Sequence, residues 1–198
     1  MRRLTDMLMK DIRFAIRQLI NSSDEELDGL LVDYRDIRLP KKGILLQPDQ
    51  PVDFIYFIQS GWLRVVIPDL KGREHTIHFS KAGDFITDYA SFLLRQVAQH
   101  RLEALEPLQL IAIPRSRIAW GYANMAEGDR LGRLIAEQYF IYQDQRLRSL
   151  YSLSPKERYD SIEDYFPGIH NKVPQHMIAS YLGITPVHLS RLKKAAIA

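Results

Sequence analysis

"QHMIASYLGITPVHLSRLKK", residues 175–194, is the stretch that decides the fold of the C-terminal part of the chain. Its apolar residues have helical spacing on both sides of Gly183. A helix-turn-helix needs a small residue where its helices cross and a residue that tolerates positive φ in its turn, and Ala179 and Gly183 occupy these positions. The inward positions are all apolar, namely Ile178, Leu182, Ile184, Leu189 and Leu192. The pattern predicts a helix-turn-helix, and the alternative is a pair of helices packed into a core.

The second helix of this motif has its own start signals. Thr185 can cap it, and Pro186 occupies its first turn. In a DNA-reading motif the outward residues near this start meet base edges in the major groove. Arg191 is the best candidate for a bidentate contact to guanine, whereas lysines neutralise phosphates. The predicted DNA-binding residues are Gln175, Thr185, Val187, His188, Ser190, Arg191, Lys193 and Lys194, with Lys172 and Ser180 as further phosphate contacts.

The distribution of charge supports a nucleic-acid partner more than its total does. The formal net charge is only +3. From Asn171 to Ala198 there are four basic residues and no Asp or Glu, and the other 23 basic residues are outnumbered by 24 acidic ones. The excess positive charge therefore lies beside the motif. A solvated basic tail is the alternative explanation.

Composition limits the class of protein. The 198 residues are 46% hydrophobic and 26% charged, which is typical of a globular chain. The absence of cysteine excludes disulfides, zinc–thiolate sites and cysteine-ligated clusters. No apolar run is long enough to span a bilayer, and charges interrupt residues 1–20, where a signal peptide would need an apolar stretch. We therefore expect a cytoplasmic protein without a membrane partner.

Short β-rich runs separated by turn signals extend from about Tyr34 to Pro114. This regular spacing predicts an antiparallel sandwich or roll rather than a parallel sheet. Helical spacing precedes it at Leu4, Leu8, Ile12 and Ile16, and Ser23 with Glu26 forms a capping-box pattern at the start of a further helix. The fold class is therefore α+β.

Helical spacing returns after Pro114. Residues 126–153 form a long amphipathic segment with near-heptad spacing, which needs a partner: the β-rich unit, a second copy, or both. Ser154, Pro155 and Glu157 predict the start of the next helix. The predicted dimer interface consists of Leu131, Leu134, Ile135, Gln138, Ile141 and Tyr142.

The order of these parts resembles the Crp/Fnr superfamily of bacterial transcription regulators over nearly the whole chain. The resemblance rests on "DFIYFIQSGWLRVVI" (53–67), "GREHTIHFSKAGDFI" (72–86) and the more specific "VPQHMIASYLGITPVHLSRLKK" (173–194). It implies an effector-sensing, cyclic-nucleotide-binding-like β-roll over residues 1–125, a dimerisation helix over 126–150 and a helix-turn-helix DNA-binding domain over 151–198. The implied function is a homodimer that reads a two-fold-symmetric site.

The resemblance is incomplete at the effector site, "GDFITDYASFLLRQVAQHRLEAL" (83–105). Asp88 stands where the family has a Glu for the ribose, but Ala98 stands where the phosphate Arg is expected. We therefore predict a divergent pocket that binds either an unidentified small-molecule effector other than cyclic AMP or no effector at all. Its predicted residues are Asp84, Thr87, Asp88, Tyr89, Arg95 and Arg101.

The family's wing, a β-hairpin after the second helix, has no counterpart before the chain ends, so we expect a motif without a full wing, natural or truncated. Arg191 stands where the family's base-reading Arg stands, whereas Pro186 and Val187 replace a basic and an acidic reader.

Other functional classes have less support. The six histidines form no ligand cluster, and nucleotide-binding and hydrolase fingerprints are absent, so we expect neither a metal, a cofactor nor an enzyme. The predicted partners are DNA and a second copy of the chain, with RNA polymerase as a further candidate. The alternative is a ligand-binding or protein-interaction module whose helix-turn-helix no longer reads DNA.

Overall fold

Two antiparallel four-stranded sheets form the β-roll of this protein, whose computed structural model describes residues 11–197, with side chains to residue 195. The first sheet has the order β1 (Arg35–Leu39), β8 (Leu108–Pro114), β3 (Phe54–Ser60) and β6 (Phe85–Ile86). The second has the order β2 (Ile44–Leu46), β7 (Arg101–Ala104), β4 (Trp62–Pro68) and β5 (Glu74–Lys81). The predicted antiparallel roll is confirmed, and neither sheet closes into a barrel.

The interior of the roll is a solid apolar core. Its fully buried members come from both sheets, because each strand alternates inward and outward side chains. They include Ile58, Leu63, Leu102, Leu110 and Ala112. Ala98, on the segment between α3 (Tyr89–Leu94) and β7, is also completely buried in this core.

Helices cover the first sheet and form a second core. Residues 11–17 are helical and bury Ile12 and Ile16, whereas Leu4 and Leu8 of the predicted segment lie outside the described residues. α2 (Asp24–Leu31) begins at the predicted capping box, with the Ser23 side chain accepting from the Glu26 amide. α4 (Arg115–Asn124) packs against α2.

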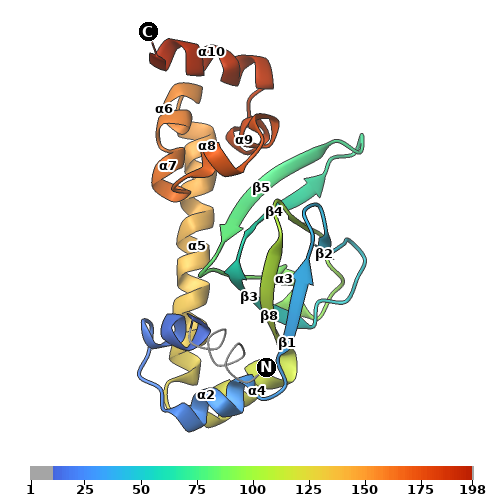
Figure 1. Cartoon of the computed structure of the whole chain (residues 1–198), viewed down its shortest axis with the longest axis vertical. Helices are drawn as coiled ribbons and strands as arrows, with labels where there is room; N and C mark the ends of the chain where they lie inside the picture. The colour runs from blue at the N-terminus through green and yellow to red at the C-terminus, as the bar shows by residue number, and fades with distance from the viewer. Residues whose placement is uncertain (1–10, 198) are drawn as a thin grey trace.

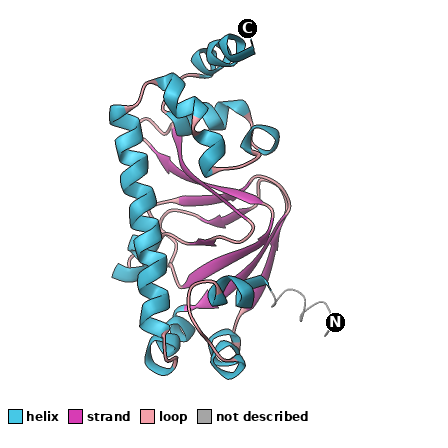
Figure 2. Ribbon diagram, turned by 90° about the vertical axis from the view of Figure 1, so that its left-hand side faces the viewer, coloured by secondary structure: helices cyan, strands magenta, loops and turns pink. Residues whose placement is uncertain are grey.

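One long helix, α5 (Gly128–Ser152), connects the two ends of the molecule, as Figure 1 shows. Its first turns join the core around α2, and it then passes along the roll, as the turned view in Figure 2 also shows. At its end α6 (Pro155–Asp160) starts at Ser154 with the predicted capping box and Pro155 in its first turn.

Four more helices complete the C-terminal part. They are α7 (Ile162–Tyr165), α8 (Ile169–Lys172), α9 (Gln175–Leu182) and α10 (Pro186–Ile197). A third core joins them to the outer face of the second sheet, through Trp62, Phe79 and Leu105. α9 lies against β5, and α10 lies at the far end from the roll (Figure 1). Among the helices of the described residues, none is long and apolar enough to cross a bilayer.

Candidate nucleic-acid interface and effector pocket

α9 and α10 have the geometry of a helix-turn-helix. Gly183 ends α9 with φ of 68°, a left-handed conformation that favours glycine. Ala179 is fully buried where the helices cross, and Leu189 of α10 is also buried in the same core. Each of these positions has the residue type that the turn, the crossing or the core demands.

α10 is capped at one end and exposed along its outer face. The Thr185 hydroxyl oxygen accepts from the backbone amide of His188 at 3.2 Å, so the predicted cap is present. The exposed residues of its outer face are Val187, His188, Ser190 and Arg191, with Lys194 exposed and Lys193 half-buried further on. These predicted DNA-binding residues therefore share one accessible helix.

α9 offers less to a ligand than the sequence predicted. The Oγ atom of Ser180 accepts from the backbone amide of Thr76 on β5 at 2.9 Å, so this hydroxyl is half-buried against the roll and its phosphate contact stays a prediction. Gln175 is half-buried, and its Oε1 has no hydrogen-bond partner within the described part of the chain. Lys172 pairs with Glu106 at 3.2 Å.

A polar and aromatic contact holds the helix-turn-helix to the rest of the molecule. The Arg146 guanidinium of α5 donates to the backbone oxygen of Tyr181 and lies 4.0 Å from the centroid of its ring. The Tyr181 hydroxyl is 3.2 Å from that of Tyr142, and the Tyr142 ring lies edge-on to His78 at 4.5 Å. We call this region, with the Ser180–Thr76 hydrogen bond, the dock.

Most predicted dimer residues are used inside the chain. Leu131 is buried, and Leu134 and Ile135 pack against the core around α2. Tyr142 belongs to the dock, and Gln138 borders a pocket. Gln138 and Ile141 are exposed, whereas the other four are at least partly buried within the chain. The heptad seam predicted from sequence therefore corresponds mainly to the face of α5 that packs on its own roll.

The opposite face of α5 carries exposed apolar residues at coiled-coil spacing. Phe140, Leu147 and Tyr151 follow one another at steps of seven and four residues and are 71%, 55% and 83% exposed. Asp144 lies between Phe140 and Leu147 at the intervening heptad position. We call Phe140, Leu147 and Tyr151 the α5 stripe. Sequence reasoning missed it because both faces of α5 are rich in apolar residues.

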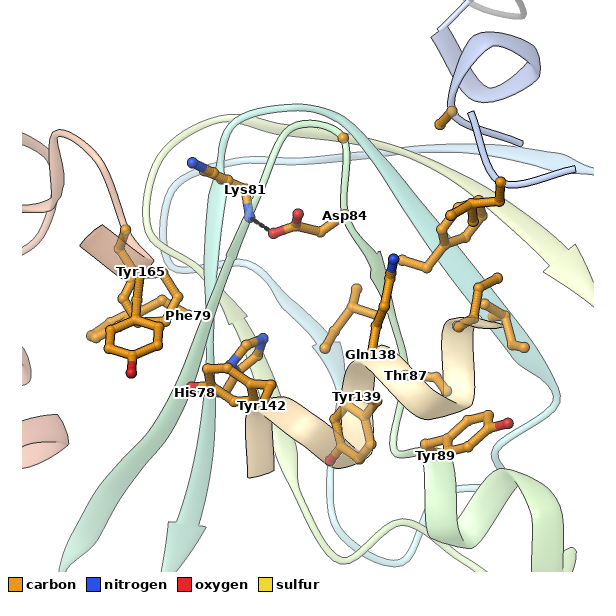
Figure 3. Close-up of a pocket in the computed structure, with 18 of the residues that line it drawn as sticks. His78, Phe79, Lys81, Asp84, Thr87, Tyr89, Gln138, Tyr139, Tyr142 and Tyr165 are labelled. Atoms are coloured by element: carbon orange, nitrogen blue, oxygen red, sulfur yellow. Dashed lines mark hydrogen bonds between the residues drawn. The ribbon is translucent and has the colours of Figure 1, made fainter. Parts of the chain in front are cut away.

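The six predicted effector residues separate into two groups. Asp84, Thr87 and Tyr89 border a pocket of about 490 Å³ between the roll, α5 and α7 (Figure 3). Arg101 instead pairs with Glu74 and Glu103 on the second sheet, and Arg95 is exposed in a left-handed turn, so neither borders the pocket.

Asp88 holds a neighbouring backbone segment and does not border the pocket. Its buried carboxylate accepts from the amides of Gln99 and His100 at 2.7 and 3.1 Å, and it lies 2.8 Å from the His100 ring. These bonds hold the segment between α3 and β7. Ala98 on that segment is buried in the apolar core of the roll, so the position where the family's phosphate Arg was expected carries no charge.

The pocket is rich in aromatic residues and has few charges. Tyr139, Tyr142 and Tyr165 enter it from α5 and α7, together with His78 on β5 (Figure 3). Burial, followed by the nearby Arg146 charge, lowers the pKa of His78 to about 3, so its imidazole is neutral near pH 7. Burial raises the pKa of Asp84, whose carboxylate accepts from the Lys81 amide at 2.8 Å.

The described residues contain no candidate metal site. Within residues 11–197, no three His, Asp or Glu side chains gather in a way that would hold a metal ion.

Comparison with known proteins places the fold. Residues 36–123, less than half of the chain, match the cyclic nucleotide-binding domain family. No curated protein matches the chain. FixK2 from Bradyrhizobium japonicum is 16% identical with a TM-score of 0.71, over 82% of this chain and 83% of its own.

Two further solved structures give the same picture. The c-di-GMP responsive global regulator CLP from Xanthomonas campestris is 15% identical with a TM-score of 0.68, over 88% of this chain and 91% of its own. A putative transcriptional regulator of the Crp/Fnr family from Eubacterium rectale is 17% identical with a TM-score of 0.68, over 87% of this chain and 82% of its own. The chain therefore has the fold of the Crp/Fnr regulators, with a roll of the cyclic nucleotide-binding type.

Proposed function

We propose that this protein is a homodimeric, DNA-binding transcription regulator of the Crp/Fnr type whose effector is not a cyclic nucleotide. The observation that carries the proposal is the exposed face of α10. Its readers project from a helix that Leu189 anchors from the inside and Thr185 caps. A helix held in this way can enter a major groove without unfolding its own support.

Electrostatics support the same assignment. The last 28 residues carry four basic side chains and no acidic one, next to the exposed face of α10. Phosphate contacts supply the sequence-independent part of DNA affinity, and Lys193 and Lys194 are suited to that role. Arg191, exposed on the same helix, is the proposed base reader.

The effector assignment follows from the missing phosphate partner. A cyclic nucleotide needs an arginine for its phosphate, and the position expected for it holds Ala98, buried in the apolar core. The pocket beside α5 is the alternative effector site. It contains three of the six residues predicted for that role, Asp84, Thr87 and Tyr89.

Dimerisation is proposed through the α5 stripe. A single helix-turn-helix reads one half-site, and two copies are needed for a two-fold-symmetric site. The stripe supplies exposed apolar side chains at heptad spacing on a 25-residue helix, which suits pairing with the same face of a second copy. RNA polymerase is a further proposed partner.

A salt-dependent titration tests the DNA-reading proposal. Fluorescence anisotropy with labelled promoter fragments should give binding that survives nonspecific competitor DNA and weakens as salt rises. Arg191→Ala should weaken the binding free energy for the preferred fragment by about 1–3 kcal/mol. It should also relax the base preference at one position per half-site. Arg38→Ala removes an arginine that is also exposed, on β1 away from α10, and is the control expected to leave the affinity unchanged.

The outcome also separates the two candidate functions. If the wild type and Arg191→Ala bind all fragments alike, the chain is not a sequence reader. It would then be a ligand-binding or protein-interaction module whose helix-turn-helix no longer reads DNA.

A further inference from the structure

We propose that the pocket between β5, β6, α5 and α7 binds an uncharged small molecule with an aromatic ring, and that it discriminates against anions. This binding property does not depend on the proposed function. Its consequence for DNA binding, described below, does rest on that function.

Aromatic side chains line the pocket from the roll, α5 and α7, and Ala15, Gln18 and Leu19 of the N-terminal segment add a non-aromatic side. Phe85 and Tyr89 come from the roll, Tyr139 and Tyr142 from α5, and Tyr165 and Phe166 from α7 and its C-terminal end. Figure 3 shows Tyr139, Tyr142 and Tyr165 around the opening, with Tyr89 beyond them. A volume of about 490 Å³ lies in the range of small-molecule sites. Aromatic walls favour a ring that can stack or pack edge-on against them.

The charged side chains that border the pocket do not form an anion site. Within the described residues they are only Lys81 and Asp84, one of each sign. The Lys81 ammonium lies 6.0 Å from the centroid of the Trp62 ring, and the Asp84 carboxylate is directed at the Lys81 backbone amide (Figure 3). No arginine of the described chain borders the pocket, so a phosphate or sulfonate would be desolvated without a bidentate partner.

A few neutral polar groups remain to orient a ligand. His78 borders the pocket as a neutral imidazole, and its buried Nδ1 has no hydrogen-bond partner in the part of the chain that is described. A buried nitrogen without a partner costs free energy that a ligand can recover after a small ring movement. Gln138 points its amide toward Asp84 across the pocket in Figure 3.

The position of the pocket gives it a regulatory consequence. Its walls come from the roll, from α5 and from the segment that leads to the helix-turn-helix, and His78 and Tyr142 are shared with the dock. A ligand that packs between Tyr142 and Phe166 therefore has different contacts in docked and undocked states. Such a difference is what shifts an equilibrium between two states.

Two dyes with the same aromatic skeleton test the chemical class. N-phenylnaphthylamine is uncharged, whereas anilinonaphthalenesulfonate carries a sulfonate, and both fluoresce when they leave water. The wild-type protein should bind the uncharged dye saturably at one site and at least about tenfold more tightly than the sulfonated dye. The bordering Lys81 is balanced by Asp84, and no arginine of the described lining can pair with the sulfonate. Cyclic AMP at high concentration should not displace the uncharged dye.

Matched variants on α5 locate the site. Gln138→Phe fills the pocket and should weaken binding of the uncharged dye about tenfold or more. Gln145→Phe places the same side chain one heptad further along α5, outside this pocket, and should change the affinity less than about twofold. Gln138→Arg should reverse the preference toward the sulfonated dye, because it supplies a guanidinium that can pair with the sulfonate. Circular dichroism of each variant confirms that it is folded.

Three results would overturn the proposal: equal affinity for both dyes, displacement by cyclic AMP, or equal binding by Gln138→Phe and Gln145→Phe. The DNA titration is a separate readout. Dye binding without sequence-specific DNA binding would reject the proposed function and keep the pocket. DNA binding without dye binding would reject the pocket and keep the regulator. Where both occur, saturating dye should change the DNA affinity, and an unchanged affinity would overturn the regulatory part.

Discussion

Asp88 shows how a residue at a ligand-binding position of the fold can become part of the scaffold. Its carboxylate is 3% exposed and accepts from two backbone amides of the segment that follows α3. Burial raises its pKa, but the hydrogen bonds from Gln99 and His100, with the His100 ring, together outweigh burial and hold the pKa below its usual 3.8. The ionised form is therefore the one that stabilises the fold.

Replacing this carboxylate should destabilise the protein in a pH-dependent way. Asp88→Asn should lower the free energy of unfolding by about 1–3 kcal/mol near neutral pH, measured by urea denaturation, because the amide donors lose a charged acceptor. Because the pKa of Asp88 is lower in the folded state than in the unfolded state, its carboxylate stabilises the fold fully at pH values above the unfolded pKa. This stabilisation is lost as the pH falls through the folded pKa. The difference from wild type should therefore shrink below about pH 4.

The control for this substitution is Asp53→Asn, whose side chain is 64% exposed. It should change the free energy of unfolding by less than about 0.5 kcal/mol. An Asp88→Asn protein as stable as this control at neutral pH would contradict the structural role of Asp88.

Residues whose role is local were predictable from the sequence. The roles of Gly183 and of the two capping boxes depend only on the backbone next to them. Gly183 and the capping residues Ser23 and Ser154 could therefore be assigned from local sequence alone. Ser180 was not predictable in this way. Its partner, the amide of Thr76, is 104 residues away in the sequence, and no local pattern indicates that contact.

At the scale of elements, α5 has two apolar faces with different partners. One face packs on the roll through Leu131 and Tyr142, and the other presents the α5 stripe to solvent. The sequence predicted the helix and its heptad spacing, because periodicity is a property of one element. Which face meets the roll depends on where the roll lies, and that depends on all eight strands.

Charge on the α5 stripe should therefore disrupt the dimer. Leu147→Glu should raise the dimer dissociation constant at least about a hundredfold, because each copy loses a buried apolar side chain and two carboxylates face each other. Sedimentation equilibrium over a range of concentrations measures this. Gln145→Glu adds the same charge off the stripe and should leave the constant within about threefold of wild type. A wild type that stays monomeric at high concentration, or two variants that behave alike, would contradict the assignment.

At the scale of the whole molecule, the dock makes the roll and the C-terminal helices share one core. Trp62 and Phe79 of the second sheet are buried against Phe166 and Tyr181, with Phe79 and Phe166 edge-on at 5.6 Å. The domain division predicted from sequence places a boundary near residue 150, but the packing crosses it. Apolar burial on both sides couples the stability of the two parts.

We expect this coupling to appear as shared protection in hydrogen exchange. In the wild type, amides of α9 should exchange with nearly the same free energy of opening as those of β4, because opening the dock exposes the core of both. Phe166→Ala should lower the stability of the shared core by about 3–5 kcal/mol. The amides of α9 should then exchange through a separate opening of lower free energy, while those of β4 stay protected. Phe14→Ala removes the same ring from an exposed position on residues 11–17 and should leave both values unchanged.

Hydrogen exchange with mass spectrometry resolves the two segments. Wild-type α9 exchanging orders of magnitude faster than β4 would mean that the helix-turn-helix is an independent unit and that the pocket cannot act on it through the dock.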